Sequence, residues 1–505
     1  MPTAYDTLQQ YFHAIAQLDH AITFLQWDQL VMMPPGGNSA RATAIAEFAA
    51  MRHEKLAANE LGDLLENATQ SIENDEMARS LKEIQTVRQN ATCIPAALVK
   101  AQSLAGSTCE HAWRQNRRDN DWQSFLQNFR EVVTLAREEA RARYDAATED
   151  LATPYDALLQ LYCRGDGSAL IDAVFTRLKD TLPQLIEKIT ARQHSPAVTL
   201  PGLFSLEDQR RLSHALMEHL GFNFDEGRLD VSSHPFSTGV HGDQRITTRF
   251  RQQDFLEALL ATAHETGHAG YEGGLPKKWD TLPIGAARNM CIHESQSLLF
   301  EKQIFLARPF FSFFATIIHE ILPQTKNFSA ERLREICCRV QPSYIRVEAD
   351  EVTYPLHVIL RFEIEKELIN GSIAPDHIPE LWDEKMLHYL GLSTAGNYRD
   401  GCMQDIHWTD GSFGYFPSYT MGALNAAQLF TAIRNEHGDW QDQLARGEIH
   451  FIRHWLQKHI WSVASSMDAQ QILEHATGQG TNPDFFLNHI EERYLGTSMS
   501  FLDGH

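Results

Sequence analysis

Hydrophobic and polar positions alternate along most of the chain with the period of an α-helix. Near the start, apolar residues recur every three or four positions and so fall on one stripe of an amphipathic helix. These residues are Tyr5, Leu8, Phe12, Ile15, Leu18, Ile22 and Leu25. A cluster of Pro and Gly at residues 33–37 predicts the end of this helix. Further helical patterns run to about residue 150, and another Pro- and Gly-containing break is predicted at residues 194–202.

Only one stretch shows the period of a β-strand. Within residues 244–250, Ile246, Thr248 and Phe250 alternate with more polar positions, and β-branched residues are frequent. Helical patterning then resumes and continues to the C-terminus, without a repeat of fixed period. We therefore predict a mainly α fold with one small β-sheet near the middle of the chain.

Composition narrows the class of protein. The 505 residues include 44 basic and 66 acidic side chains, a formal charge of −22, with 43% hydrophobic residues. These values are typical of a globular protein, and the acidic balance argues against nucleic acid or an anionic membrane as a partner. The richest apolar run, residues 309–318, is too short to span a bilayer. Seven cysteines without a C-x-x-C pattern, and an N-terminus without signal-peptide features, favour a reduced, cytoplasmic protein.

One motif predicts a metal site. Residues 264–268 form an H-E-x-x-H pattern of His264, Glu265 and His268. On a helix, residues four apart lie about 40° apart around the axis, so both imidazoles can bind one ion. Glu265 lies beside that ion, where it can take a proton from a bound water. Because the chain has 24 histidines, this motif alone is only suggestive.

A third ligand strengthens the prediction. Catalytic zinc usually has three protein ligands and a water. Glu294 lies 26 residues after His268 in a second helical pattern, whose same face also carries Glu301. A helix-loop-helix of this length can return Glu294 to the first helix, which would complete a His-His-Glu site. The alternative is that Glu294 is an exposed, solvated side chain.

The two motifs together resemble a known family. HETGH at residues 264–268, followed by HESQS at 293–297, is similar to the M32 carboxypeptidases, the carboxypeptidase Taq family of zinc enzymes. Other elements of that family follow in the same order. They are WDQ with MMP at 27–34, HPF at 234–236, DQRIT at 243–247, IRVEAD at 345–350, GCMQDIHW at 401–408 and GYFPSY at 414–419.

The resemblance implies an architecture and an activity. It implies one peptidase domain over residues 1–505, in which two helical lobes enclose a deep groove with zinc on its floor. We expect residues 1–230 to form a helical lid, 231–430 the catalytic core and 431–505 C-terminal helices. The implied enzyme is a homodimeric zinc carboxypeptidase acting on peptides with a free C-terminus. The implied cofactor is one Zn²⁺ per chain, for which Co²⁺ or another divalent metal is expected to be able to substitute.

The resemblance also implies roles for several residues. Arg346, in the IRVEAD element, is expected to bind the terminal carboxylate, because a guanidinium offers paired donors. The alternative is an internal ion pair with Glu348 or Asp350. Arg245 is a second candidate for the clamp, although pairing with Asp243 to brace the strand is favoured.

The oxyanion of the reaction needs hydrogen-bond donors. His407 and Tyr419 are the candidates, with Tyr415 third, and each could instead serve packing alone. His234 is similar to an active-site residue of the family, with a structural role as the alternative. His293 either orients the neighbouring ligand or packs.

The strand before the metal helix is expected to pair with the substrate as an antiparallel edge strand. The alternative is an internal strand. Two further functions remain possible alternatives to a carboxypeptidase: a zinc oligopeptidase or endopeptidase without a carboxylate clamp, and a non-catalytic helical scaffold that binds no stoichiometric metal.

Overall fold

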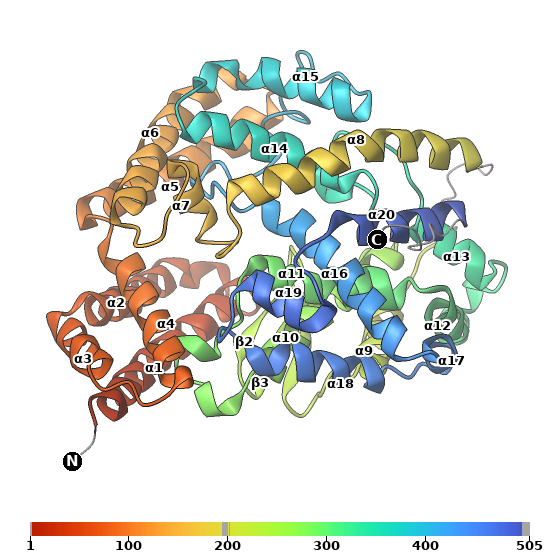
Figure 1. Ribbon diagram of the computed structural model, residues 1–505. Coiled ribbons are helices and arrows are strands. Elements are labelled where there is room, and N and C mark those ends of the chain that lie inside the picture. The colour runs from red at the N-terminus through yellow and green to blue at the C-terminus, as the bar shows by residue number, and fades with distance from the viewer. Residues whose placement is uncertain (1–2, 194–199, 201, 497–505) are drawn as a thin grey trace, which may run out of the picture.

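Helices dominate the chain, as the hydrophobic periodicity predicts. The computed structural model describes residues 3–193, 200 and 202–496, and its described part is mainly α with one three-stranded sheet (Figure 1). The first helix, α1 (Ala4–Val31), buries Leu8, Phe12 and Ile15 and ends just before the predicted breaker cluster. The break predicted at residues 194–202 lies almost entirely outside the described residues.

The N-terminal helices form a layer on one side of the molecule (Figure 1). Helix α1 packs with three further helices around a small hydrophobic core. They are α2 (Asn38–Ala57), α3 (Asn59–Thr69) and α4 (Asp75–Thr92). The same core contains Trp279 and Ile284 from the middle of the chain. The layer is therefore attached to the segment that follows the metal helix.

Two larger cores build the rest of the fold. One is shared by helices from both halves of the chain. These are α5 (Ala96–Arg118), α6 (Trp122–Ala146), α7 (Pro154–Leu159), α8 (Ser168–Arg192), α14 (Tyr354–Ile369), α15 (Ile378–Leu390), α16 (Pro417–Glu436) and α20 (Pro483–Ile490). This core crosses residues 230 and 430, so hydrophobic packing joins the three sequence segments.

The other large core surrounds the metal helix, α10 (Leu256–Gly274). Helix α16 contributes to this core as well, through Ala426, Leu429 and Phe430. The other helices of this core include α9 (Leu206–His219), α12 (Arg308–Ile321), α13 (Ala330–Cys337), α17 (Trp440–Ala445), α18 (His450–His459) and α19 (Ala469–Thr477). Helix α11 (Met290–Leu298) lies where the two large cores meet. Its neighbouring residues Cys291 and Ile292 are buried in different cores. The helix that carries Glu294 is therefore held on both sides.

The small sheet corrects one expectation. Strand β3 (Asp243–Thr248) pairs in parallel with β1 (Gly227–Val231) and antiparallel with β2 (Phe236–Val240), in the order β1-β3-β2. The predicted strand exists, but its assignment as a substrate-binding edge is wrong, because β3 has hydrogen-bonded neighbours on both sides. The edge strand that contacts α10 is β2.

Among the described helices, no single one is long and apolar enough to cross a membrane. One pair of segments, residues 283–305 and 308–321, which meet at a bend of 75°, reaches that length and apolar composition only when the two are taken together.

Candidate metal centre

The H-E-x-x-H residues lie in the middle of α10, as the motif predicts. Glu265 and His268 are buried, at 7% and 9% exposure. The unspecified fourth position of the motif, Gly267, makes the site possible. A Cβ atom there would lie 2.5 Å from the backbone oxygen of Gln296 on α11. Because only glycine lacks this atom, it allows α10 and α11 to approach closely enough to share a ligand set.

Helix α16 holds α11 from the opposite side. A Cβ atom on its Gly422 would lie 2.4 Å from the Cβ of Glu294. Glu294 is thus fixed between two helices that each contribute a glycine at the contact. Sequence reasoning missed both glycines, because their role appears only once the helices are packed.

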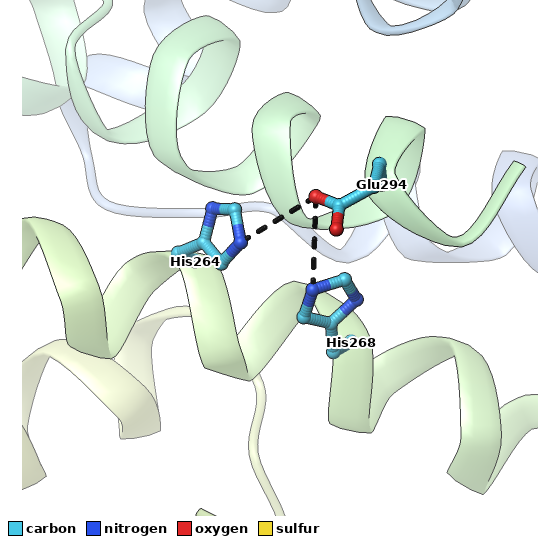
Figure 2. Close-up of side chains that lie close together, drawn as sticks. All are labelled: His264, His268 and Glu294. Carbon is cyan, nitrogen blue, oxygen red and sulfur yellow. Dashed lines mark ion pairs between the residues drawn. The ribbon is translucent and has the colours of Figure 1, made fainter. Parts of the chain in front are cut away.

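The three predicted ligands converge (Figure 2). Oε2 of Glu294 lies 3.7 Å from Nε2 of His264 and 3.9 Å from Nε2 of His268. One donor atom from each residue lies within 4.8 Å of the others. Two imidazole nitrogens and one carboxylate oxygen leave a fourth position for water, the ligand set of a catalytic zinc site.

The remaining nitrogens of both histidines are also engaged. Nδ1 of His264 lies 3.0 Å from Oε2 of Glu301, whose other oxygen pairs with Lys302. Nδ1 of His268 bonds to Nδ1 of His293, and Nε2 of His293 lies 2.9 Å from Glu272.

These bonds assign tautomers that suit a metal. If Nε2 of each histidine faces the ion, the Nδ1 proton of His264 is donated to Glu301, and that of His268 to His293. His293 then donates from Nε2 to Glu272. The residues present therefore fit a divalent cation, and His293 lies where it can orient His268 rather than merely pack.

The charges around the centre also favour a cation. Burial alone would lower the pKa of His264, but the bond to Glu301 and the nearby Glu265 and Glu294 raise it to about 9. Burial raises the pKa of Glu265 to about 7 despite the opposing effect of His264. A site that raises the pKa of a buried histidine this far has a negative potential, which attracts a divalent ion.

Glu301 reaches the centre through an irregular helix. Helix α11 continues as a π-helical segment, Leu299–Phe305, rather than as the regular α-helix that was predicted. Such segments are frequent at functional sites. Burial would raise the pKa of Glu301, but Lys302 and His264 outweigh it and lower the value to about 2. Glu301 is thus an ionised acceptor for His264.

A pocket of about 770 Å³ opens over the centre and is lined by His264, Glu265 and Glu294. Arg346 lines the same pocket, 4% exposed. Its Nε and Nη2 donate to Oδ1 of Asp405 at 3.0 and 2.9 Å. The expected alternative partners, Glu348 and Asp350, are therefore wrong: the ion pair is with Asp405, 59 residues away in sequence.

Two further residues complete this cluster. Arg361, fully buried, also pairs with Asp405, through Nη2 at 2.6 Å. Nη1 of Arg346 donates to the hydroxyl oxygen of Tyr354, which also lines the pocket. Because that oxygen accepts from Arg346, the hydroxyl hydrogen of Tyr354 remains free to donate. Sequence reasoning missed Tyr354 and Arg361, although both follow the IRVEAD element closely.

The oxyanion candidates divide into two groups. His407 and Tyr419 line the pocket, with Nε2 of His407 3.5 Å from the hydroxyl of Tyr419. Burial and the nearby Arg346 lower the pKa of His407 to about 4, so this ring is neutral. Tyr415 does not line the pocket but packs edge-on against Tyr419, with ring centroids 5.2 Å apart.

The two other predicted substrate residues lie further out. His234 is exposed and lines the pocket, with Nδ1 2.9 Å from its neighbour's carbonyl, Pro235 O. Arg245 does not line the pocket. It forms a bidentate ion pair with Asp243, as favoured, and its guanidinium lies 4.6 Å from the ring centroid of Trp27. Arg245 thus connects the sheet to α1.

A buried glutamate holds the segment that carries His407. Glu365 on α14 accepts from Nε1 of Trp408 at 2.7 Å and from the backbone N–H of Gly414 at 3.0 Å. It also accepts from the hydroxyl of Tyr155, at 3.0 Å. The first two bonds hold the loop between α15 and α16 on the pocket wall, and the third connects α14 to α7.

Two histidines on one helix, a carboxylate from the next and an adjacent glutamate define the class of a metallopeptidase. The chain belongs to the family described as carboxypeptidase Taq (M32) metallopeptidase, which it matches over residues 7–494. The protein is accordingly a metallocarboxypeptidase that uses a divalent metal ion.

Relatives of known name support this assignment over nearly the full length. The thermostable carboxypeptidase 1 of Thermus thermophilus is 34% identical over 97% of this chain and 98% of its own. Metallocarboxypeptidase 1 of Trypanosoma cruzi superposes with a TM-score of 0.94 at 35% identity, covering 97% of this chain and 99% of the other. The carboxypeptidase of Pyrococcus furiosus has a TM-score of 0.94 at 30% identity, covering 98% and 99%. The predicted two-lobed helical fold is confirmed.

Proposed function

We propose that this enzyme is a zinc-dependent carboxypeptidase that removes single residues from the free C-terminus of peptides. The observation that carries the proposal is that two members of a His-His-Glu ligand set, His264 and Glu294, line one pocket together with the buried guanidinium of Arg346. His264, His268 and Glu294 would hold the metal. When bound, Zn²⁺ makes water more acidic and polarises a peptide carbonyl as a Lewis acid. Co²⁺ or another divalent metal is expected to substitute.

Glu265 is the proposed general base. Its carboxylate lines the pocket next to the ligands, and burial has raised its pKa to about 7. A base with a pKa near the working pH can both accept and return a proton. Glu265 therefore takes a proton from the attacking water and transfers it to the leaving amine.

Arg346 and Tyr354 are the proposed carboxylate clamp. Asp405 accepts hydrogen bonds from Nε and Nη2 of Arg346, and Tyr354 accepts one from Nη1. Nη1 and Nη2 each keep a second hydrogen to donate into the pocket. The free hydroxyl hydrogen of Tyr354 adds a further donor. Asp405 thereby fixes the orientation of the guanidinium without neutralising the cluster, because Arg361 supplies a second positive charge.

Tyr419 or His407 is the proposed donor to the carbonyl oxygen as it gains charge. Both line the pocket, whereas Tyr415 is proposed to support Tyr419 from behind and to contribute to substrate binding indirectly. His234 and Arg245 are proposed to act at the outer part of the site. Arg245 does so through the position of α1 rather than by contact with the terminal residue.

The remaining proposals concern the environment of the enzyme. We infer a homodimer from the resemblance to the family. We also infer a cytoplasmic enzyme, because all seven cysteines are free and structural disulfides are rare in that compartment. Peptides are the proposed partners, and neither nucleic acid nor a membrane is expected. The three segments 1–230, 231–430 and 431–505 are proposed to act as one peptidase domain.

Metal content and product analysis test the proposal together. The purified enzyme is expected to contain one zinc per chain and to release only the last residue of a short peptide acid. The amidated form of the same peptide is the control. Internal cleavage of the amide at an equal rate would favour the endopeptidase alternative. Absence of stoichiometric metal after incubation with zinc would favour the scaffold alternative.

A further inference from the structure

A second cavity, of about 570 Å³, lies on the other side of the metal centre from the first pocket. The order of residues along α10 shows this. The first pocket is lined by Ala261 and His264, and the second by Glu272 and Leu275 at the end of the same helix. His268 lies between them. The opposite wall of the second cavity comes from one face of α1, which includes Ile15, Ala16, Asp19 and Thr23.

An edge strand runs from one cavity to the other. Pro235, just before β2, lines the first pocket, and Gly239, Val240 and His241 line the second. Among the residues that the structure describes, β2 pairs only with β3 and so is an edge strand of the sheet. Alternate residues of an edge strand direct their N–H and C=O groups outward, where an extended peptide can pair with them.

The second cavity carries an excess of negative charge. Four carboxylates and two guanidinium groups line it. Arg52 pairs with Asp19, and Arg288 pairs with Glu83. Two carboxylates remain. The side chain of Glu272 is 40% exposed and accepts a hydrogen bond from His293, but it forms no ion pair with Lys or Arg in the described part of the chain. Asp280 is exposed and forms no ion pair within the same part of the chain. These two carboxylates, neither of which pairs with Lys or Arg among the described residues, favour a cation in the cavity.

We infer that this cavity, the upstream chamber, binds the part of the peptide that precedes the cleaved bond and prefers a cationic group there. The inference rests on the proposed carboxypeptidase function. The eight residues from His264 to Glu272 correspond to about 12 Å of helix, which an extended peptide covers in three to four residues. The cation is therefore the N-terminal ammonium of a pentapeptide, or a Lys or Arg side chain at the same position of a longer peptide.

Filling the chamber tests its use by substrate. Ala16→Trp places an indole on the half-buried, cavity-lining position of α1, and Ala14→Trp places the same group on an exposed position outside the lining. An N-acetylated dipeptide is too short to reach the chamber, whereas a pentapeptide spans it. Ala16→Trp should lower kcat/KM about tenfold for the pentapeptide and leave kcat/KM for the dipeptide unchanged. Ala14→Trp should change neither. A tenfold decrease corresponds to the loss of one or two hydrogen bonds.

The dipeptide arm separates the two levels of the proposal. If the wild-type enzyme releases no C-terminal residue from any peptide acid, the proposed function fails. If it cleaves both substrates but Ala16→Trp affects them equally or not at all, the upstream chamber alone is overturned. Loss of dipeptide cleavage through misfolding is recognised by circular dichroism, and Thr23→Trp on the same face then replaces the variant.

Charge selection is tested with Asp280→Asn, with Asp63→Asn on the surface of α3 as the matched control. Wild type should cleave a pentapeptide with a free N-terminus faster than its acetylated form. It should also cleave an acetylated heptapeptide faster when the residue three positions before the one whose carbonyl is cleaved is Lys rather than Gln. The first pair reports the ammonium and the second the side chain. Asp280→Asn should reduce at least one preference by up to about fivefold, the range for a partly exposed charge pair, and Asp63→Asn neither. Equal preferences in wild type and Asp280→Asn would overturn the proposed selection.

Discussion

Replacing Arg346 by alanine should separate binding of the terminal carboxylate from folding. The buried cluster contains one carboxylate, Asp405, between two guanidinium groups. When Arg346 is removed, Arg361 still pairs with Asp405, so no buried carboxylate is left without a cation. Breaking a buried pair is strongly destabilising chiefly when it leaves a charge uncompensated. The variant should therefore fold and retain its metal.

The catalytic effect should be large. A substrate carboxylate that enters the pocket must lose water, and charge-assisted hydrogen bonds of roughly 1.5–3 kcal/mol each compensate for that loss. Losing two such bonds corresponds to a decrease in kcat/KM of about 10²-fold or more for peptide acids. Arg346→Lys should recover only part, because an ammonium lacks the planar fork. Tyr354→Phe should have a smaller effect, in the same direction and mainly on KM.

The assay compares kcat/KM for a peptide acid with that for its C-terminal amide. Wild type should cleave the amide poorly, and the alanine variant should no longer distinguish the two. Circular dichroism and metal content establish that the variant is folded and loaded. A folded, metal-loaded Arg346→Ala enzyme that keeps the preference of wild type for the acid would refute the clamp.

Three further predictions concern the centre and its support. Glu265→Gln should bind metal normally but lose nearly all turnover, because it removes the base; near-normal kcat with metal bound would show that another group accepts the proton. Glu294→Ala should lose its metal, whereas Glu301→Ala, which removes only a partner of a ligand, should lower metal affinity about 10–100-fold; equal metal retention by the two variants, measured by elemental analysis, would contradict the ligand assignment. Asp405→Asn should lower the free energy of unfolding, measured by urea titration, by about 3–5 kcal/mol, because it leaves two buried guanidinium groups without a carboxylate. The control Asp376→Asn, which removes one partner of an exposed ion pair, should have a far smaller effect in the same titration. Burial alone would raise the pKa of Asp405, but the two arginines hold it well below its usual range. The contribution of Asp405 to the free energy of unfolding should therefore be present at neutral pH and decline as the pH falls below about 4, the pKa of an unfolded Asp. A stability difference between wild type and Asp405→Asn that did not shrink in acid would contradict this.

Much of the fold and of the ligand set could be predicted because the signals are local. The stripe from Leu8 to Ile15 lies on one helix face through the 3.6-residue period alone. His264 and His268 face one ion for the same reason. The pairing of Arg245 with Asp243 follows from the two-residue period of a strand, which puts both side chains on one face. The family resemblance added the expected groove and the order of the motifs.

Tertiary packing decided what these local rules leave open. Spacing allowed Glu294 to return to α10, but the glycines at 267 and 422 determine how closely α11 is held. A strand pattern does not show how many neighbours a strand has, and so β3 was assigned to an edge although it is central. Nothing in the local pattern of Arg346 points to Asp405, because an ion pair between residues 59 apart depends on which loops share a wall of the pocket. Local geometry thus determined which side chains carry the chemistry, whereas long-range packing selected their partners. The reason is that a charge can be buried, or two helices joined, only where the complete set of neighbours compensates for the lost hydration and fills the space between them.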